Sequence, residues 1–135
     1  MHMTKDQFKS FVLNVGVAFL MTHELDAVMN KEWLVLPLTN WLSPAVGYQV
    51  FLWFHVPLFT VILALFSASS NRLRRIAAST LSVFLIVHAG LHWLFSGHEH
   101  YEFSSISSNL LIYGGAVFGV FYLSINQTKE RGDHE

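Results

Sequence analysis

The sequence contains no cysteine and few charged residues, and both absences narrow what the protein can be. Without cysteine, it can form neither a disulfide framework nor a thiolate metal site. Only 13% of its 135 residues are charged and 53% are hydrophobic, whereas soluble domains carry about 25% charged residues. No Lys, Arg, Asp or Glu occurs over residues 33–71, 76–98 or 103–128, and each gap exceeds the roughly 20 residues that a helix needs to cross a bilayer. The composition therefore predicts an integral membrane protein. It includes no basic patch large enough to bind nucleic acid.

Four apolar segments predict four transmembrane helices, and hence an all-α, four-helix bundle. They run over about residues 8–28, 45–68, 73–96 and 104–125. Each must be helical because unpaired backbone polar groups are not tolerated in hydrocarbon, and their polar side chains need partners inside a bundle. The first segment is predicted to remain as a helix, because no small-residue cleavage site follows its apolar run. By length, residues 1–135 are expected to form a single domain.

The basic residues predict the orientation of the chain. Of the eight Lys and Arg residues, only Lys31 falls on the side opposite to the termini. Because Lys and Arg are retained in cytoplasmic loops, both termini are predicted to be cytoplasmic and loops 29–44 and 97–103 external. The expected location is the cytoplasmic (inner) membrane of a bacterium. The first external loop carries Trp33 and Trp41, so we expect it to lie along the membrane surface, with Glu32 as a solvated interface residue.

Three of the four segments place a histidine at nearly the same depth, in the outer half of the membrane. Counted at 1.5 Å per residue from the cytoplasmic end of each helix, His23 and His55 lie about 20 Å deep and His88 about 18 Å deep. His92 follows His88 by four residues and shares its helix face, and Asp26 shares a face with His23. The matched depth predicts that these side chains meet inside the bundle.

A polar group of this size in lipid must be mutually satisfied or bound to an ion. Imidazole and carboxylate are the ligands that Zn²⁺, Fe²⁺, Mn²⁺ or Cu²⁺ take where no thiol is present. We therefore predict a transition-metal site, with Zn or Fe favoured over Cu or Mn, and with these candidate ligands: His23, Asp26, His55, His88, His92 and His98. His100 and Glu102, close to His98 in the outer loop, would support the site or line the route to it.

The sequence leaves open whether the protein is an enzyme. If it is, the metal would activate water for hydrolysis, or O₂ for oxidation, of a lipid-soluble substrate, and Glu24 is the candidate catalytic acid or base. The stretch “THELDAV” does not match a zinc-protease helix, because Ala27 stands where the second histidine is needed.

Three other interpretations of the histidines remain. One is a haem b protein for electron transfer, with iron held by His55 together with His88 or His23. Another is a small proton or metal-ion transporter, although the inner half offers only Asn14 and a few hydroxyl side chains for a path. The last is a hydrogen-bonded network that only holds the helices together.

The expected partners are those of a small membrane protein. They are the lipid bilayer, a lipid-soluble small molecule and a second copy of the chain, with no nucleic acid. Gly115 and Gly119, at small-xxx-small spacing, let a neighbouring helix approach closely and offer a face for a homo-oligomer.

The stretches “HELDA”, “FHVP” and “HAGLH” resemble small bacterial membrane proteins of the same general kind as the HXXEE domain family. That family is named for a histidine followed by two acids on a membrane helix. The residues that carry the resemblance are His23, Asp26, His55, His88 and His92. It implies a polytopic membrane protein with histidines and acids on its helices, and it brings no established activity.

Overall fold

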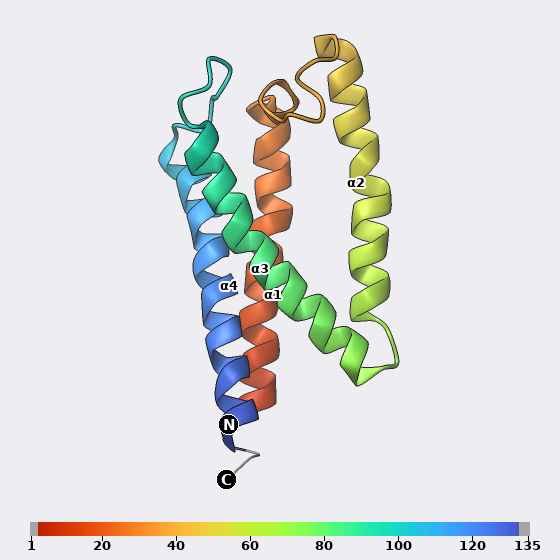
Figure 1. Cartoon of the computed structure of the whole chain (residues 1–135), viewed down its shortest axis with the longest axis vertical. Helices are drawn as coiled ribbons and strands as arrows, with labels where there is room; N and C mark the ends of the chain where they lie inside the picture. The colour runs from red at the N-terminus through yellow and green to blue at the C-terminus, as the bar shows by residue number, and fades with distance from the viewer. Residues whose placement is uncertain (1–2, 133–135) are drawn as a thin grey trace.

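Four long helices and one short 3₁₀ helix make up the protein (Figure 1). The computed structural model describes the backbone of residues 3–132 and the side chains of residues 3–126. Its helices are α1 (Lys5–Met29), η1 (Glu32–Leu34), α2 (Pro44–Phe66), α3 (Asn71–Phe95) and α4 (Ile106–Gly132), and no strand occurs over residues 3–132. Each long helix is long and apolar enough to cross a membrane. The predicted all-α, four-span class is therefore confirmed, although α4 continues to Gly132 and not only to the predicted end near residue 125.

Local signals in the sequence explain where the helices begin. Thr4 and Gln7 form a capping box at the start of α1, in which each side chain accepts a hydrogen bond from the backbone N–H of the other residue. Ser70 caps α3 by accepting a hydrogen bond from the N–H of Leu73. Pro44 opens α2 at a position where the missing N–H costs no hydrogen bond.

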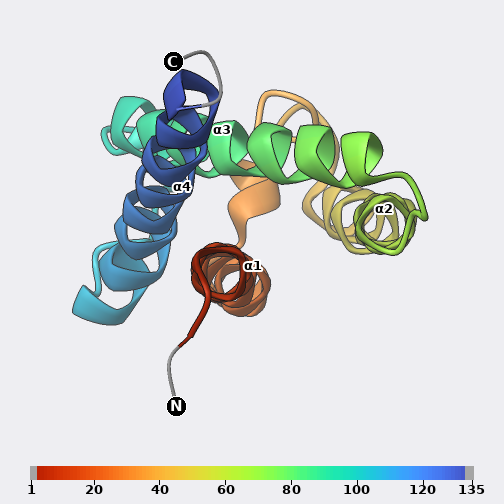
Figure 2. The same ribbon diagram turned by 90° about the horizontal axis from the view of Figure 1, so that it is seen from below.

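Helices α1, α3 and α4 pack against one another, and α2 lies to one side of them (Figures 1 and 2). Helix α4 packs along α1 and α3, whereas α2 touches mainly α3 and η1. Only 6% of the most apolar stretch of α2 is buried within the chain, compared with 28–33% for the other three helices. Most of α2 is therefore left for lipid to cover.

Small residues allow the three packed helices to approach closely. A Cβ atom added to Gly119 of α4 would lie 2.6 Å from the backbone oxygen of Ser82 on α3. Cβ atoms added to Gly16 of α1 and Gly115 of α4 would lie 3.2 and 3.4 Å from the side chain of Leu85, also on α3. As their spacing predicts, Gly115 and Gly119 of α4 let a neighbouring helix approach closely, and that helix is α3 of the same chain. A homo-oligomer through the same face stays a prediction.

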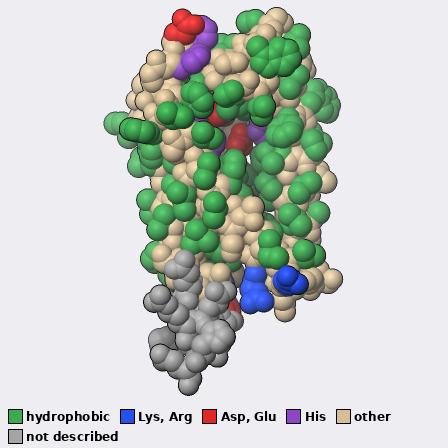
Figure 3. Space-filling view, in the orientation of Figure 1, with side chains coloured by type: hydrophobic (Ala, Val, Ile, Leu, Met, Phe, Trp, Pro, Cys, Tyr) green, Lys and Arg blue, Asp and Glu red, His purple; other side chains and the backbone are tan. Residues whose placement is uncertain are grey.

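The two ends of the bundle differ in charge. Helix α1 begins and helix α4 ends at the same end of the bundle (Figure 1), and Lys and Arg side chains gather there (Figure 3). Lys129 and Arg131, which also supported the predicted orientation, lie outside the residues whose side chains are described. We call the opposite end, which carries η1 and the connection 96–105, the outer end. Its external position stays a prediction from the charges.

Candidate metal centre

Three histidines and one glutamate meet near the outer end. We call these residues the His–Glu cluster: His23 of α1, Glu32 of η1, and His88 and His92 of α3. Each offers one ring nitrogen or carboxylate oxygen, and these four atoms all lie within 4.8 Å of one another. Three of the four residues are buried and His88 is partly buried. In Figure 3, acidic and histidine side chains are visible in a recess among hydrophobic ones.

The local structure explains how residues far apart in the sequence converge. His88 and His92 are one helical turn apart and therefore share a face of α3. His23 lies in the last two turns of α1, and Lys31 then adopts a left-handed conformation with φ 51° that starts η1. Such a conformation is unusual for a residue with a side chain. It reverses the chain within two residues of the end of α1 and brings Glu32 back over that end.

Several separations within the cluster are close to those of atoms that share one ion. Nε2 of His92 lies 3.2 Å from Nε2 of His88 and 3.5 Å from Oε1 of Glu32. Nε2 of His23 lies 3.8 Å from Oε2 of Glu32. Ligands held about 2.0–2.1 Å from a tetrahedral ion are about 3.3–3.4 Å apart. The four side chains can therefore coordinate a transition metal with small adjustments of their positions.

His23 is the side chain whose polar atoms are least satisfied by the protein. It is 1% exposed, and neither of its ring nitrogens has a hydrogen-bond partner among the described residues. A buried polar atom without a partner costs about 1–3 kcal/mol, and native proteins contain few of them. A metal ion bound to Nε2 would supply one of the two missing partners.

Aromatic side chains surround the cluster on its outer side. Phe103 is 1% exposed, and its ring centroid lies 4.7 Å from that of His92 and 5.6 Å from that of His23. The hydroxyl of Tyr101 is hydrogen-bonded to Nδ1 of His92 at 3.2 Å. Because Nδ1 of His92 is engaged in this way, Nε2 is left to face His88 and Glu32. A hydrogen bond of this kind fixes the tautomer and orientation of a metal-binding histidine.

The two titratable groups that the loops contribute have shifted pKa values. Burial alone would raise the pKa of Glu32, but the contact with His92 and the charges of the three neighbouring imidazoles outweigh burial and lower it. Glu32 is therefore available as a carboxylate. Burial raises the pKa of Tyr101 to about 12, with smaller contributions from Tyr113 and Glu32, so its hydroxyl keeps its proton.

Glu24 and His55 form a separate pair between α1 and α2, beside the cluster. Nδ1 of His55 lies 2.7 Å from the carbonyl oxygen of Phe51, and Nε2 lies 2.7 Å from Oε2 of Glu24. A carbonyl can only accept, so Nδ1 carries a proton, and the short contact with Glu24 holds one further proton. Because both ring nitrogens are engaged, the structure does not bring His55 into the His–Glu cluster.

The other predicted site residues lie apart from the cluster. Asp26 is partly buried, and its Oδ2 has no hydrogen-bond partner among the described residues. His98 lies in the outer connection near His100, with ring centroids 5.7 Å apart, and the ring of His100 lies beside Glu99. Glu102 forms an exposed ion pair with Lys31 at 3.3 Å.

The expectation that Glu32 is solvated is wrong. Its exposed fraction is 5%, and it contacts two of the histidines. Trp33, expected at the membrane surface, is also buried, and its ring packs against Tyr48 and Phe51 of α2, whereas Trp41 is 74% exposed. A signal was present in the sequence: Glu32 opens a long apolar loop, and an acid in such surroundings needs a partner.

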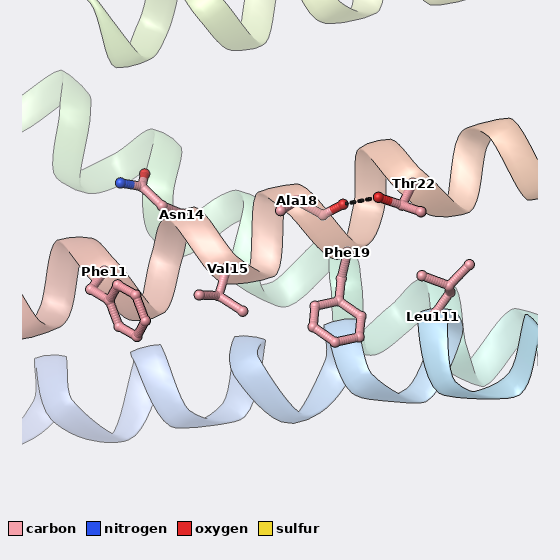
Figure 4. Close-up of a pocket in the computed structure, with 7 residues that line it drawn as sticks. All are labelled: Phe11, Asn14, Val15, Ala18, Phe19, Thr22 and Leu111. Atoms are coloured by element: carbon pink, nitrogen blue, oxygen red, sulfur yellow. Dashed lines mark hydrogen bonds between the residues drawn. The ribbon is translucent and has the colours of Figure 1, made fainter. Parts of the chain in front are cut away.

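Of two cavities in the described part of the bundle, the smaller one touches the cluster and the larger one does not. A groove of about 400 Å³ runs between α1 and α4 and is lined mostly by apolar side chains (Figure 4). Its polar lining residues are Asn14 and Thr22, and the hydroxyl of Thr22 donates to the carbonyl of Ala18 at 2.8 Å. Nothing in this groove can ligate an ion through an imidazole or a carboxylate. The second cavity, of about 20 Å³, adjoins Glu32, His88 and His92.

Comparison with known proteins identifies a family without assigning a function. The chain belongs to a family of unknown function, DUF6713, which matches residues 9–129. No curated protein and no solved structure matches the chain. The likeness to the HXXEE domain family and the bacterial origin stay predictions from the sequence.

Proposed function

Because the family has no assigned function, we propose from the site itself that the protein is a membrane metalloprotein. A single transition-metal ion is held by His23, Glu32, His88 and His92 at the outer end of the bundle. The observation that carries this proposal is the convergence of four ligand atoms within 4.8 Å of one another. Under the predicted orientation, the ion lies toward the outer face of a bacterial cytoplasmic membrane.

The hydrogen-bond partners that the buried side chains lack favour a bound ion over a purely structural polar network. A network is stable when every member has a hydrogen-bond partner. His23 has none over the residues whose side chains are described, and the His88–His92 contact pairs two nitrogens that can share only one proton. One ion would bind all three imidazoles and the carboxylate at once, which satisfies these atoms better than any arrangement of protons.

The composition of the ligand set favours zinc or iron. Three imidazoles and one carboxylate suit both ions, whereas manganese prefers sets richer in oxygen and copper(I) prefers softer thiolate or thioether ligands. If the centre is catalytic, the ion would activate water or O₂ toward a lipid-soluble substrate. Glu24, next to His23 in sequence, is the carboxylate outside the ligand set that would move a proton.

The geometry favours a bare ion over haem. A haem needs room for a flat macrocycle between two axial imidazoles. The ring centroids of His23, His88 and His92 lie 4.6–4.9 Å from one another, and the adjoining cavity measures about 20 Å³. His55, the other haem ligand considered from the sequence, is bound to Glu24 and to Phe51.

The packing below the cluster favours ion binding over ion transport. Leu20, Leu81 and Leu85 form a buried apolar cluster between α1 and α3. Val12, Ala78 and Tyr122 form another one. An ion path would need polar side chains or water at these levels, so we propose that the ion remains at the outer end.

Metal analysis of the purified protein tests the proposal. The full chain is solubilised in detergent, incubated with Zn²⁺ or Fe²⁺, freed of excess metal and analysed by elemental mass spectrometry. One ion per chain is expected for the wild type, and less than a tenth of that for the double variant His88→Ala/His92→Ala.

A matched variant controls for the loss of histidine as such. His98→Ala/His100→Ala removes two histidines from the exposed outer connection, and it should retain one ion per chain. A wild-type protein with no bound metal, or equal metal in both double variants, would contradict the proposal. A Soret absorption band in the purified protein would favour haem instead.

A further inference from the structure

A small cavity adjoins the His–Glu cluster on one side. It has a volume of about 20 Å³ and is lined by Glu32, His88, His92 and Tyr101, and otherwise by apolar side chains. His23 does not line this cavity, so the cavity lies on the side of the cluster away from α1. A water molecule needs at least about 10–15 Å³ of such space. The cavity therefore has room for one water molecule or a ligand of very few atoms.

The charges around the cavity indicate which ligand would be stable there. A divalent ion bound to three neutral imidazoles and one carboxylate leaves a net charge of about +1. No other charged side chain lines the cavity among the residues that the structure describes. An uncompensated charge is costly in surroundings of low polarity. A ligand carrying one negative charge would neutralise the centre.

The hydroxyl of Tyr101 supplies a donor for such a ligand. When Nε2 of His92 binds the ion, Nδ1 carries the imidazole proton and donates to the oxygen of Tyr101, 3.2 Å away. The proton of the Tyr101 hydroxyl is then directed elsewhere. Tyr101 lines the cavity, and its hydroxyl has no other hydrogen-bond partner over residues 3–126. The hydroxyl can thus donate to an atom bound inside the cavity.

We propose that the ion held by these four protein ligands expands to five-coordination and takes hydroxide or another small monoanion as its fifth ligand, on the side of this cavity. Tyr101 donates a hydrogen bond to that ligand. The inference rests on the proposed function, because it needs the metal. It goes further by assigning a fifth position for an exogenous ligand, which is the mark of a reactive centre, whereas a structural centre would stay closed at four ligands.

Cobalt substitution combined with azide tests the inference. Co²⁺ reports its ligands through its visible spectrum, and azide is a small linear monoanion. The full chain in detergent is loaded with Co²⁺, its metal content is measured, and azide is then titrated in parallel with benzoate. A saturable spectral change is expected with azide and none with benzoate, because benzoate is too large for about 20 Å³.

Substitution of the donor separates its role from that of the ion. Tyr101→Phe should still bind one Co²⁺ per chain at saturating metal, but its affinity for azide should fall about tenfold through loss of one hydrogen bond to a charged ligand. Tyr122→Phe makes the same chemical change in the inner half of the bundle, on α4, and should leave azide binding unaltered.

The outcomes distinguish this inference from the proposed function. Bound Co²⁺ with a spectrum that azide does not change would overturn the fifth position and leave the metal centre in place. Equal azide affinity in the wild type and in Tyr101→Phe would remove Tyr101 from the account. No stoichiometric Co²⁺ in the wild type would overturn both proposals.

Discussion

The inner and outer halves of the bundle are held together by different interactions. In the inner half, the three packed helices touch through small residues, so that a carbonyl of α3 lies against Gly119 of α4. In the outer half, imidazoles and a carboxylate fill the space between the helices, and His23 has no hydrogen-bond partner in the described part of the chain. The inner half is closed by the packing of its own side chains, whereas the outer half holds the His–Glu cluster, for which we propose a bound ion. The inner half thus holds the helices together, and the outer half carries the proposed metal centre.

Removal of the metal should produce the largest difference between the two halves. A ligand present at a hundred times its dissociation constant stabilises the folded protein by about 2.7 kcal/mol. Chelation should therefore lower the melting temperature and speed amide exchange at the end of α1, in η1 and in the outer turns of α3. The inner turns of α1, around Val12 and Gly16, should change little. Uniform loosening of the whole chain, or none, would remove the distinction between the halves.

Removal of the negative charge of Glu32 should have the next largest effect. Glu32→Gln keeps the shape of the side chain but removes its charge, and we expect the affinity for Zn²⁺ to fall about a hundredfold or more, because even residues that only support a ligand contribute 10–100-fold. Glu102→Gln makes the same change in an exposed ion pair with Lys31 and should alter affinity little. Competition with a coloured chelator measures both. Equal affinities would exclude Glu32 from the ligand set.

The packing of the inner half can be broken without touching the metal. A Cβ at Gly119 would lie 2.6 Å from the backbone of α3, whereas a Cβ at Gly90 meets nothing within 4 Å. Gly119→Ala should therefore destabilise the protein by about 1–3 kcal/mol, and Gly90→Ala should be neutral. Thermal unfolding in detergent, followed by circular dichroism, makes the comparison. Metal content should stay at one ion per chain in both variants, and loss of the ion in Gly119→Ala would show that the halves are coupled.

The contact between α1 and α2 should have the smallest effect. Glu24→Leu removes the hydrogen bond to His55 and should cost about 1 kcal/mol, with faster amide exchange confined to α2. Thr22→Val removes a hydrogen bond within α1 itself and should leave α2 as it is. Amide hydrogen exchange, measured by mass spectrometry on both variants, decides whether the Glu24–His55 pair anchors α2. Loss of metal in Glu24→Leu would instead make Glu24 part of the centre.

Some of this arrangement could be predicted from the sequence because it follows from helix geometry. The gaps in charge gave the four helices, and the i,i+4 spacing placed His88 and His92 on one face. Depth along the helices also matched His23 with His88, since rise per residue is fixed. These inferences need only the regular dimensions of an α-helix.

The remainder depended on features that spacing cannot reveal. His55 lies at the matching depth, but the rotation and position of α2 direct it to Glu24, and hydropathy is the same whether a helix faces lipid or protein. Glu32 reaches the cluster because Lys31 adopts a left-handed conformation, and a residue other than glycine gives little warning of such a turn. The uniformly apolar sequence of α2 also gave no sign that this helix packs so sparsely against the others.

X-ray absorption spectroscopy of the zinc-loaded protein tests the central claim most directly. Zinc bound by His23, Glu32, His88 and His92 should show three imidazoles at about 2.0–2.1 Å and one carboxylate oxygen at about 2.0–2.2 Å, with any further oxygen from an exogenous ligand. The same measurement on His98→Ala/His100→Ala should give the same spectrum. Zinc surrounded by oxygen atoms alone, or by fewer than two imidazoles, would contradict the account.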